Sequence, residues 1–326
     1  MSVYTSVNRV ELEQFLLQYN IGELVDSTGI SAGMENTNYF LDTTKGRYVL
    51  TLYEAYSKEE LPFFLGLMQH LSAHQVETIN PVADREGQLL HHLCGKPAAI
   101  IERLQGSALQ QSEVTIEHCA LIGDALARFH LAGLSYPLYR ENEDRNHYLS
   151  SPITDSLFSV LSDEEKKLLL QELDFHKKIH WNELPSGITH SDLFCDNSVF
   201  YTVDNKLILS GIIDLYLACN DAFIYDLAVV ANDWCCNADH HLDQQRWLAL
   251  LSAYNKVRKL ESVEKQAWVA MLRSGALRFW LSRLDNKLNP PEGEMVLCKS
   301  PDDYKLKLQA CLQDQEDIMQ AIDTLF

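Results

Sequence analysis

The sequence lacks the features of an exported, membrane-bound or disulfide-stabilised protein. Charged residues interrupt every apolar stretch of its 326 residues well before membrane-spanning length, and no basic segment near the N-terminus leads into an apolar run. The eight cysteines are scattered without C-x-x-C spacing, which argues against a zinc site or a redox pair. We therefore expect a soluble, cytoplasmic protein with free thiols and no membrane partner.

Basic charge is also scarce, with 27 Lys and Arg residues against 46 Asp and Glu residues and a formal net charge of −19. Binding to a nucleic-acid backbone requires a concentrated basic patch, so we expect no nucleic-acid partner. Hydrophobic residues make up 46% of the chain, which is enough for a substantial core in one two-lobed enzyme or two modest domains. No sequence feature indicates an oligomeric state.

A polar run in the second half of the chain has the spacing of a phosphotransferase active site. It reads His190-Ser191-Asp192-Leu193-Phe194-Cys195-Asp196-Asn197, and an apolar stretch ending in Asp214 follows it. Kinase-like enzymes use an Asp to orient the attacking hydroxyl, an Asn on the same loop to bind magnesium, and a second Asp after the next hairpin. We therefore predict Asp192 as the catalytic residue and Asn197 and Asp214 as metal ligands. The competing interpretation is a solvated acidic loop that only binds a cation.

The residues between Asn197 and Asp214 predict a β-hairpin. Residues 199–203 (Val-Phe-Tyr-Thr-Val) are typical of a strand, Asp204-Asn205 is suited to a tight turn, and residues 206–213 return as a second strand. This hairpin would deliver Asp214 beside the loop that carries Asp192. It would thereby close the metal site.

The first third of the chain predicts a small, strand-rich lobe. Helical spacing over residues 10–19 is followed by alternation typical of paired strands over 30–53, an amphipathic helix over 57–73 and a buried strand at 98–101. The segment 29–39 contains two glycines and occupies the place of a phosphate-covering loop, so Gly33 and Asn36 are candidate nucleotide ligands. The connector 102–106 is the place where a hinge would contact adenine, which makes Glu102 and Leu104 further candidates.

The remainder of the chain predicts a larger and mostly helical lobe. Helical periodicity is strong over residues 114–131, 163–180, 223–235, 246–257 and 267–284. The loosest stretches are 135–146, which we expect near the substrate, and 286–300. The fold class that we predict is two-lobed α+β, with an N-terminal lobe at 1–102, a C-terminal lobe at 103–326, and ATP between them.

Several segments resemble the homoserine kinases that are built on the aminoglycoside-phosphotransferase, protein-kinase-like fold. The resemblance runs in order from near Gly29 to about Arg283 and is carried by residues 48–54, 60–64, 190–197, 213–216, 218–221, 225–228, 232–234 and 278–283. It implies ATP and Mg²⁺ as cofactors and L-homoserine as the substrate, with O-phospho-L-homoserine, an intermediate on the route to threonine, as the product. Within this fold, choline, ethanolamine, an aminoglycoside or a sugar is the alternative acceptor.

One position departs from the general kinase pattern. The third strand normally carries a Lys that pairs with the nucleotide phosphates, whereas this chain has Thr51, which donates a hydrogen bond but no positive charge. The homoserine kinases that the chain resembles also have Thr there. Lys45, Arg47 and Arg103 are candidate substitutes for the missing cation. The missing Lys also permits a pseudokinase that binds nucleotide without turnover.

The substrate implied by the resemblance carries an α-ammonium and an α-carboxylate beside its hydroxyl. Its pocket should therefore contain a carboxylate together with a guanidinium or a helix N-terminus. The acidic candidates are Asp221 and Asp233, the basic candidates are Arg278 and Arg283, and Trp234 is a candidate wall. The structural alternative is that Asp221 caps the following helix, Arg278 pairs internally and the tryptophan belongs to the core.

Overall fold

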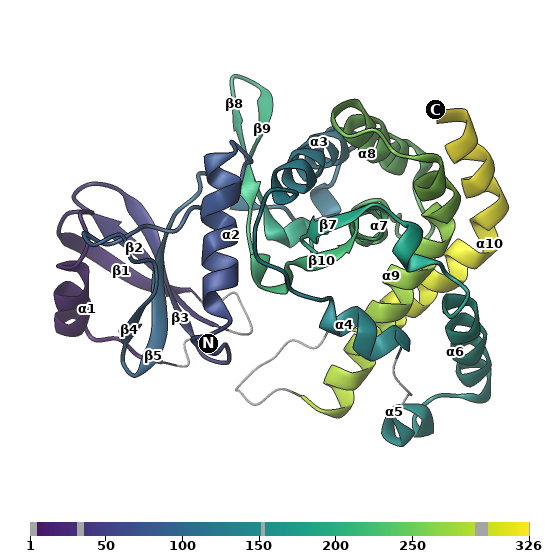
Figure 1. The fold of residues 1–326 in the computed structure, drawn as a ribbon, viewed down its shortest axis with the longest axis horizontal. Helices are drawn as coiled ribbons and strands as arrows, with labels where there is room; N and C mark the ends of the chain where they lie inside the picture. Colours follow the sequence, from purple (N-terminus) through teal and green to yellow (C-terminus); the bar gives the residue numbers. More distant parts are fainter. Residues whose placement is uncertain (1–4, 31–35, 151–153, 291–298, 326) are drawn as a thin grey trace. The chain divides into compact units, whose positions relative to one another are not determined.

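The structure is a computed structural model that describes residues 5–30, 36–150, 154–290 and 299–325. The described residues up to Gln105 form one compact unit and those from Gly106 form a second one. The change of unit falls within the segment 102–106, where the sequence indicates a connector. Each unit is described by itself below, and Figure 1 gives the course of the chain.

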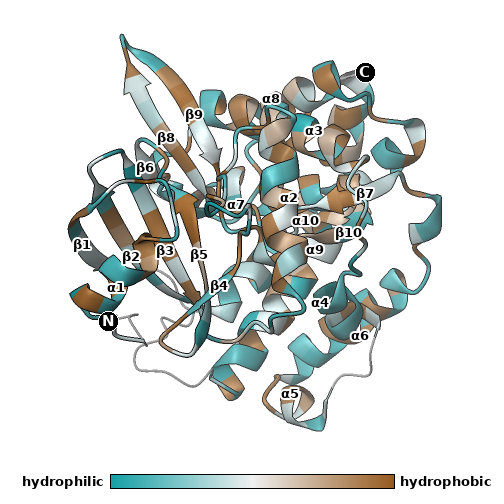
Figure 2. Ribbon diagram, turned by 60° about the vertical axis from the view of Figure 1, so that its left-hand side comes forward, coloured by the Kyte–Doolittle hydropathy of each residue, from teal (hydrophilic) through white to brown (hydrophobic). Residues whose placement is uncertain are grey.

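Unit 1 is a five-stranded antiparallel sheet in the order β1-β2-β3-β5-β4. Its elements are α1 (Arg9–Leu16), β1 (Leu24–Ile30), β2 (Asn36–Thr43), β3 (Arg47–Tyr53), α2 (Leu61–Ala73), β4 (His91–Leu93) and β5 (Lys96–Glu102). Leu12 and Phe15 of α1 pack with Leu50 and Leu52 of β3 and Ile100 of β5 in one apolar cluster. Strand β5 is brown in Figure 2 because its residues are hydrophobic, which suits their burial.

Helix α2 begins later than the sequence predicts, at Leu61 and not near residue 57. Pro62 lies in the first turn, where its missing N–H costs nothing. Glu60 precedes the helix, and its side chain accepts hydrogen bonds from the Ser57 backbone N–H at 3.0 Å and the Ser57 hydroxyl at 2.7 Å. The preceding residues therefore form a turn that leads into α2.

Unit 2 is mostly helical. Its α-helices are α3 (Ile116–Gly133), α4 (Glu143–Arg145), α5 (Asp155–Ser159), α6 (Asp163–His176), α7 (Phe223–Trp234), α8 (Gln244–Val257), α9 (Ser262–Leu288) and α10 (Pro301–Leu325). Short helices are η1 (Gln111–Glu113), η2 (Asn146–Ser150), η3 (Trp181–Glu183), η4 (Cys195–Asn197) and η5 (Leu215–Leu217). Helix α3 packs against α8 and α10 against α9, while every residue of α7 is buried (Figure 1).

Two small antiparallel sheets complete unit 2. One pairs β7 (Ser186–Thr189) with β10 (Cys219–Ala222), and the other has the order β6 (Ser107–Ala108), β8 (Ser198–Val203) and β9 (Lys206–Ile212). Asp204 and Asn205 both adopt positive φ, 51° and 59°, as a tight hairpin turn requires. The predicted hairpin between Asn197 and Asp214 is therefore confirmed.

The secondary-structure predictions hold for the long helices and fail at some connections. The stretch 135–146, predicted as loose, contains the helix α4. Helix α9 ends at Leu288, four residues beyond the predicted helix end at 284 and inside the predicted loose stretch 286–300. Helix α10 is not among the predicted helices, although its buried residues recur at helical spacing. The α+β class itself is confirmed. None of the helices in the described ranges is long and apolar enough to cross a membrane.

Candidate active site around Asp192

The loop after β7 is held by a carboxylate of α7. The two oxygens of Asp226 accept hydrogen bonds from the backbone N–H groups of His190 at 2.8 Å and Ser191 at 2.7 Å. Asp226 is completely buried and also contacts Nε2 of His130 at 2.9 Å. Burial acts to raise the pKa of Asp226, but the hydrogen bond and charge of His130 outweigh it and lower that pKa. The carboxylate is therefore ionised and fixes the backbone immediately before Asp192.

Two turns further along α7, Asp233 and Trp234 hold the other side of the same loop. Asp233 accepts a hydrogen bond from the Cys195 backbone N–H at 2.8 Å, and the Trp234 indole N–H donates to the Leu193 carbonyl at 2.9 Å. Trp234 is fully buried and Asp233 is 7% exposed. The polar groups of these two residues contact the loop backbone, and the prediction that they bind substrate stays a prediction.

The three residues of the motif meet at one place in unit 2. The Asn197 side-chain amide donates to the Asp192 carbonyl at 2.8 Å, and the Asn197 carbonyl accepts from the Ile213 N–H at 3.0 Å, next to Asp214. His190 bridges the same two segments, because its Nε2 lies 2.9 Å from the Ile213 carbonyl. Asp214 has a left-handed backbone, φ 61° and ψ 60°. Such conformations are costly for non-glycine residues and cluster at functional sites.

The carboxyl group of Asp192 lies in an environment that disfavours its charge. Its side chain is 21% exposed. Burial raises the pKa of Asp192 well above its usual range, Arg278 opposes that shift through its positive charge, and the neighbouring Asp214 adds to it. A carboxyl with a raised pKa is a stronger proton acceptor once it is ionised. The loop therefore presents a candidate base whose ionisation depends on nearby cations.

The donor set beside Asp192 fits a magnesium ion. Asn197 and Asp214 offer the amide and carboxylate oxygens that hard divalent cations prefer, and the repulsion between Asp192 and Asp214 would be relieved by a cation. In the described ranges, no three His, Cys, Asp or Glu side chains gather to hold a metal by themselves. That is the pattern of Mg²⁺ sites, where one or two carboxylates share the ion with substrate phosphates and water.

Arg278 of α9 is the predicted basic residue that does reach this site. Its Nη1 lies 3.9 Å from Oδ1 of Asp192, and its Nη2 contacts Oδ2 of Asp144 at 2.6 Å. The Arg278 side chain is 6% exposed, whereas that of Asp144 is 42% exposed. The guanidinium thus joins the loop that carries Asp192 to α4, the short helix within the stretch 135–146 that we expected near the substrate.

Two further polar residues of this region escape sequence analysis. The Tyr148 hydroxyl of η2 donates to Oδ2 of Asp285 on α9 at 3.2 Å. Burial raises the pKa of Tyr148, and the negative charges of Asp285 and Asp144 act in the same direction while Arg278 opposes them. Tyr148 and Asp285 therefore form a second contact between this segment and α9, in addition to that of Asp144 with Arg278. They belong to no motif; Tyr148 follows the stretch 135–146 that we expected near the substrate, and no pattern in the sequence points to Asp285.

Lys299, which precedes α10, supplies a second positive charge to this site. Its Nζ lies 3.2 Å from Oδ2 of Asp196 and 5.0 Å from the centre of the Phe194 ring. Its charge acts to lower the pKa of Asp192, as that of Arg278 does. The catalytic loop is thus flanked by one buried and one half-exposed cation.

The remaining substrate candidates have structural partners. Asp221 pairs with Arg145 at 2.6 Å and accepts from the Asn142 amide at 2.7 Å, so it anchors α4. Arg283 pairs with Asp303 of α10 at 3.0 Å and lies over the Tyr304 ring. That Asp221 and Arg283 bind substrate stays a prediction. Asp221 holds a segment of the site in place, and Arg283 ties α9 to α10.

The nucleotide candidates lie in unit 1, apart from Gly33, which falls outside the described residues. Thr51 of β3 is 3% exposed and its hydroxyl donates to the Asn38 side chain at 2.8 Å. Asn36 is 6% exposed, and its side-chain oxygen has no hydrogen-bond partner among the described residues. Glu102 is exposed at the end of β5, and Leu104 is half-buried. Their roles stay predictions.

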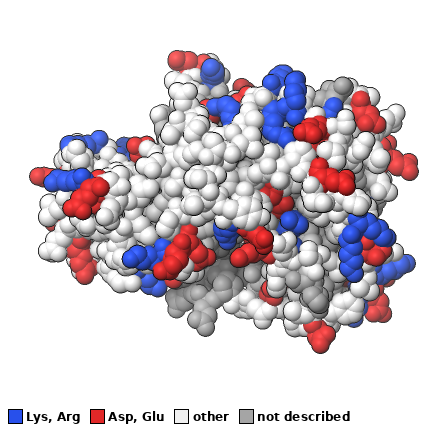
Figure 3. Space-filling view, viewed as in Figure 1, with Lys and Arg blue, Asp and Glu red and all other residues white. Residues whose placement is uncertain are grey.

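The three candidate substitutes for the missing Lys are engaged elsewhere in unit 1. Lys45 donates to the Asn20 side chain at 2.6 Å, and Arg47 lies 3.6 Å from Asp42. The guanidinium carbon of Arg103 lies 3.8 Å from the centre of the Phe40 ring. Each contact gives the cation a local role in unit 1. The face of the molecule seen in Figure 3 likewise shows acidic and basic side chains interspersed.

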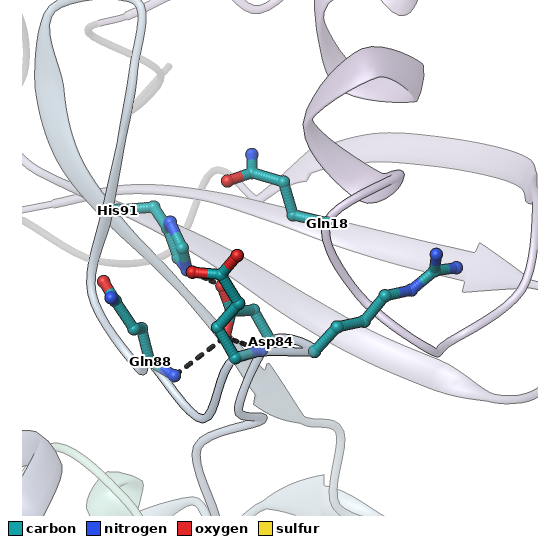
Figure 4. Close-up of a pocket in the computed structure, with 6 residues that line it drawn as sticks. Gln18, Asp84, Gln88 and His91 are labelled. Carbon is teal, nitrogen blue, oxygen red and sulfur yellow. Dashed lines mark hydrogen bonds and ion pairs between the residues drawn. The ribbon is translucent and has the colours of Figure 1, made fainter.

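Unit 1 also contains a pocket. It is lined by Gln18, Asp84, Arg85, Glu86, Gln88 and His91. Asp84 accepts hydrogen bonds from the backbone N–H groups of Glu86 and Gln88, both at 2.8 Å (Figure 4). None of the predicted site residues lines it, so it does not correspond to the predicted nucleotide site.

Comparison with known proteins places the chain in a family. The profile of the phosphotransferase enzyme family (APH) matches residues 26–260. The chain is 41% identical to homoserine kinase from Methylobacillus flagellatus over 98% of both chains. It is 43% identical to homoserine kinase from Neisseria meningitidis serogroup B over 94% of this chain and 98% of that protein.

A solved structure shows the same fold at much lower sequence identity. An amicoumacin kinase, in complex with AMP-PNP, Ca²⁺ and amicoumacin, aligns with a TM-score of 0.68 at 16% identity, over 96% of this chain and 94% of that one. The predicted kinase-like fold is therefore confirmed. Because the family profile covers most of the chain and the similarity to these kinases runs over nearly its full length, the chain belongs to the phosphotransferase enzyme family and, within it, to the homoserine kinases.

Proposed function

We propose that the protein transfers the γ-phosphoryl group of ATP to the side-chain hydroxyl of L-homoserine, giving O-phospho-L-homoserine. The observation that carries this proposal is the Asp192 carboxyl group, held on a rigid loop beside Asn197, Asp214 and Arg278 in a chain of this family. Phosphoryl transfer needs positioning and charge stabilisation more than covalent chemistry, and this arrangement supplies both.

Asp192 is the proton acceptor in this mechanism. Its carboxylate would orient the substrate hydroxyl and take up the proton as the oxygen bonds to phosphorus. His190 is unsuited to that role, because it is completely buried and its Nε2 is engaged by the Ile213 carbonyl. Burial also lowers the pKa of His190, so its neutral ring donates to that carbonyl and keeps Asp214 beside the loop.

Asn197 and Asp214 would bind Mg²⁺. The ion supplies charge neutralisation of the phosphate oxygens and a fixed orientation of the phosphoryl group. The protein keeps the two ligands together through the hydrogen bond between the Ile213 N–H and the Asn197 carbonyl at 3.0 Å. In unit 1, Thr51, Asn36 and Gly33 are the candidate contacts for phosphates, and Glu102 and Leu104 those for adenine.

Arg278 is the candidate for the substrate carboxylate. Its guanidinium has five N–H donors, and the contacts with Asp144 and Asp192 leave some of them available. A buried guanidinium that recognises a carboxylate favours an amino acid over choline or ethanolamine, which have no carboxylate. The same positive charge opposes the rise that burial causes in the pKa of Asp192.

Release of ADP in the presence of ATP and Mg²⁺ tests the proposal, with L-homoserine, choline, ethanolamine and an aminoglycoside as parallel acceptors. The wild type should turn over L-homoserine selectively, and Asp192→Asn should lose activity by a factor on the order of a thousand. Asp317→Asn is the matched control, because Asp317 is exposed on α10 and the substitution removes the same charge. Turnover with another acceptor would overturn the substrate assignment, and silence with all four would indicate a pseudokinase.

A further inference from the structure

Helix α9 presents a guanidinium and a carboxylate to one region of unit 2. Arg278 and Asp285 are two helical turns apart and therefore lie on the same face of α9. Residues of η2 pack against that helix, and Tyr148 of η2 donates its hydroxyl hydrogen bond to Asp285. Arg278 contacts Asp144, which lies four residues before Tyr148, so α4 and η2 run along this face of α9, whose Arg278 reaches to 3.9 Å from Asp192.

Asp285, which is half-buried, differs from two buried carboxylates of unit 2 in the kind of partner that it has. Glu172 pairs with Arg273 at 2.9 Å, and Glu264 pairs with Arg258 at the same distance. Among the described residues, the side-chain partners of Asp285 are neutral, namely the Tyr148 hydroxyl and the Asn289 amide at 2.9 Å. A half-buried carboxylate whose side-chain partners are neutral keeps its charge available for a cationic group of a ligand.

The ligand of this site, on the function proposed above, carries its positive charge close to its hydroxyl. In L-homoserine the ammonium and the carboxylate share one carbon, two bonds away from the carbon that bears the hydroxyl. With the hydroxyl at Asp192 and the carboxylate at Arg278, the ammonium must lie within reach of the same helix face. Asp144 is less suited to it, because Asp144 already pairs with Arg278 at 2.6 Å.

We infer that Asp285, oriented by Tyr148, binds the α-ammonium group of the substrate and so selects amino-acid alcohols over hydroxy acids. This inference rests on the proposed phosphorylation of homoserine. Asp285 accepts hydrogen bonds from the ammonium group, and Tyr148 keeps the Asp285 carboxylate turned toward the substrate. Asp285 is thus a specificity-determining residue that takes no part in proton transfer.

Steady-state kinetics with three acceptors test this role. They are L-homoserine, 4-hydroxybutyrate, which lacks the ammonium, and 3-amino-1-propanol, which lacks the carboxylate. Asp285→Asn keeps an oxygen for Tyr148 but removes the charge. We expect kcat/KM for L-homoserine and 3-amino-1-propanol to fall about 10- to 100-fold, mainly through KM, while that for 4-hydroxybutyrate changes less than about 3-fold. Tyr148→Phe should shift the same ratio about 3- to 10-fold.

The ratio of homoserine to hydroxybutyrate activity is the readout that a merely structural role would not move. An equal loss with all three acceptors, or an unchanged ratio in both variants, would overturn the inference while leaving the proposed function intact. Absence of wild-type turnover with L-homoserine would instead overturn the proposed function. Asp317→Asn, with the same change of charge on an exposed part of α10, should leave the ratio unchanged.

Discussion

The two units differ in how they handle charge where chemistry is expected. In unit 1, the strand position that carries a Lys in other kinases is occupied by Thr51, whose hydroxyl is engaged by Asn38. In unit 2, Asp192 lies among charged neighbours of both signs, with Arg278 and Lys299 acting against the effect of Asp214. The Thr51 position in unit 1 is uncharged and its hydroxyl has a neighbouring partner, whereas unit 2 concentrates charge around the Asp192 carboxyl group.

This contrast indicates where the charge of the transferred phosphoryl group is compensated. A neutral Thr51 offers a hydrogen bond but no cation, and the candidate cations Lys45, Arg47 and Arg103 contact residues of unit 1 itself. The described cations that act on Asp192 are Arg278 and Lys299 of unit 2. Under the proposed function, unit 2 and its metal therefore carry most of the electrostatic stabilisation.

The largest effect that would sharpen this contrast is expected from Asp214→Asn. Loss of the carboxylate removes a proposed metal ligand, so we expect kcat to fall on the order of a hundred- to a thousand-fold and the Mg²⁺ concentration for half-maximal activity to rise. Magnesium titrations of ADP release measure both quantities. Unchanged magnesium dependence in a folded variant would remove Asp214 from the metal site.

A second comparison sets a buried carboxylate of unit 2 against a half-buried carboxylate of unit 1. Asp226 in unit 2 holds the catalytic loop, while Glu54 in unit 1 pairs with Lys96 at 3.0 Å and accepts from Thr37 and Thr5. Asp226→Asn should lower the free energy of unfolding by about 3 kcal/mol, because it breaks a buried charge network, and should lower kcat about 10- to 100-fold.

Glu54→Gln should lower stability by a smaller amount and leave kcat within about 3-fold of the wild type. Urea unfolding and steady-state kinetics on both variants make the comparison. The pKa of Asp226 is lowered in the folded state, so its stabilisation is present above the carboxyl pKa of the unfolded chain and is lost as pH falls toward the folded value. Equal losses of kcat in both variants would mean that the unit 2 carboxylate has no special role in positioning the loop.

The third effect concerns the pH dependence of activity. Burial raises the pKa of Asp192 and Arg278 lowers it, so removing Arg278 should raise it further. Arg278→Gln should therefore move the ascending, acidic limb of the kcat/KM profile to higher pH and reduce kcat/KM about tenfold or more at neutral pH. Arg283→Gln is the matched control on the same helix, because its partner is Asp303. A limb that stays in place in Arg278→Gln would contradict the proposed coupling.

The sequence predicts the catalytic hairpin well because its determinants are local. The apolar alternation of β8 and β9, the Asp204-Asn205 turn and the spacing from Asp192 to Asn197 all lie within a short stretch of chain. Such patterns specify register without information from the rest of the fold. The fold class follows for the same reason, since the long helices and the paired strands each have their own periodicity.

The substrate side of the site depends on contacts that are not local in the sequence. Asp221 precedes α7 and Asp233 lies within it, and their side chains contact α4 and the loop after β7. Tyr148 and Asp285 are far apart in the sequence and meet because η2 packs against α9. The sequence around a polar residue does not show whether its side chain will contact a ligand or hydrogen-bond to the backbone of a distant segment.

The smallest effect is expected at the position that departs most from the kinase pattern. Thr51→Ala removes the hydrogen bond to Asn38, which should cost about 1 kcal/mol of stability, and it removes no charge from the phosphate site. We therefore expect KM for ATP to rise less than about fivefold, with kcat nearly unchanged. Kinetics at varied ATP, together with thermal unfolding, would separate the two contributions. A loss of kcat as large as that of Asp214→Asn in a folded Thr51→Ala variant would show that unit 1 shares the electrostatic role, because a neutral hydroxyl could then only act through the phosphates themselves.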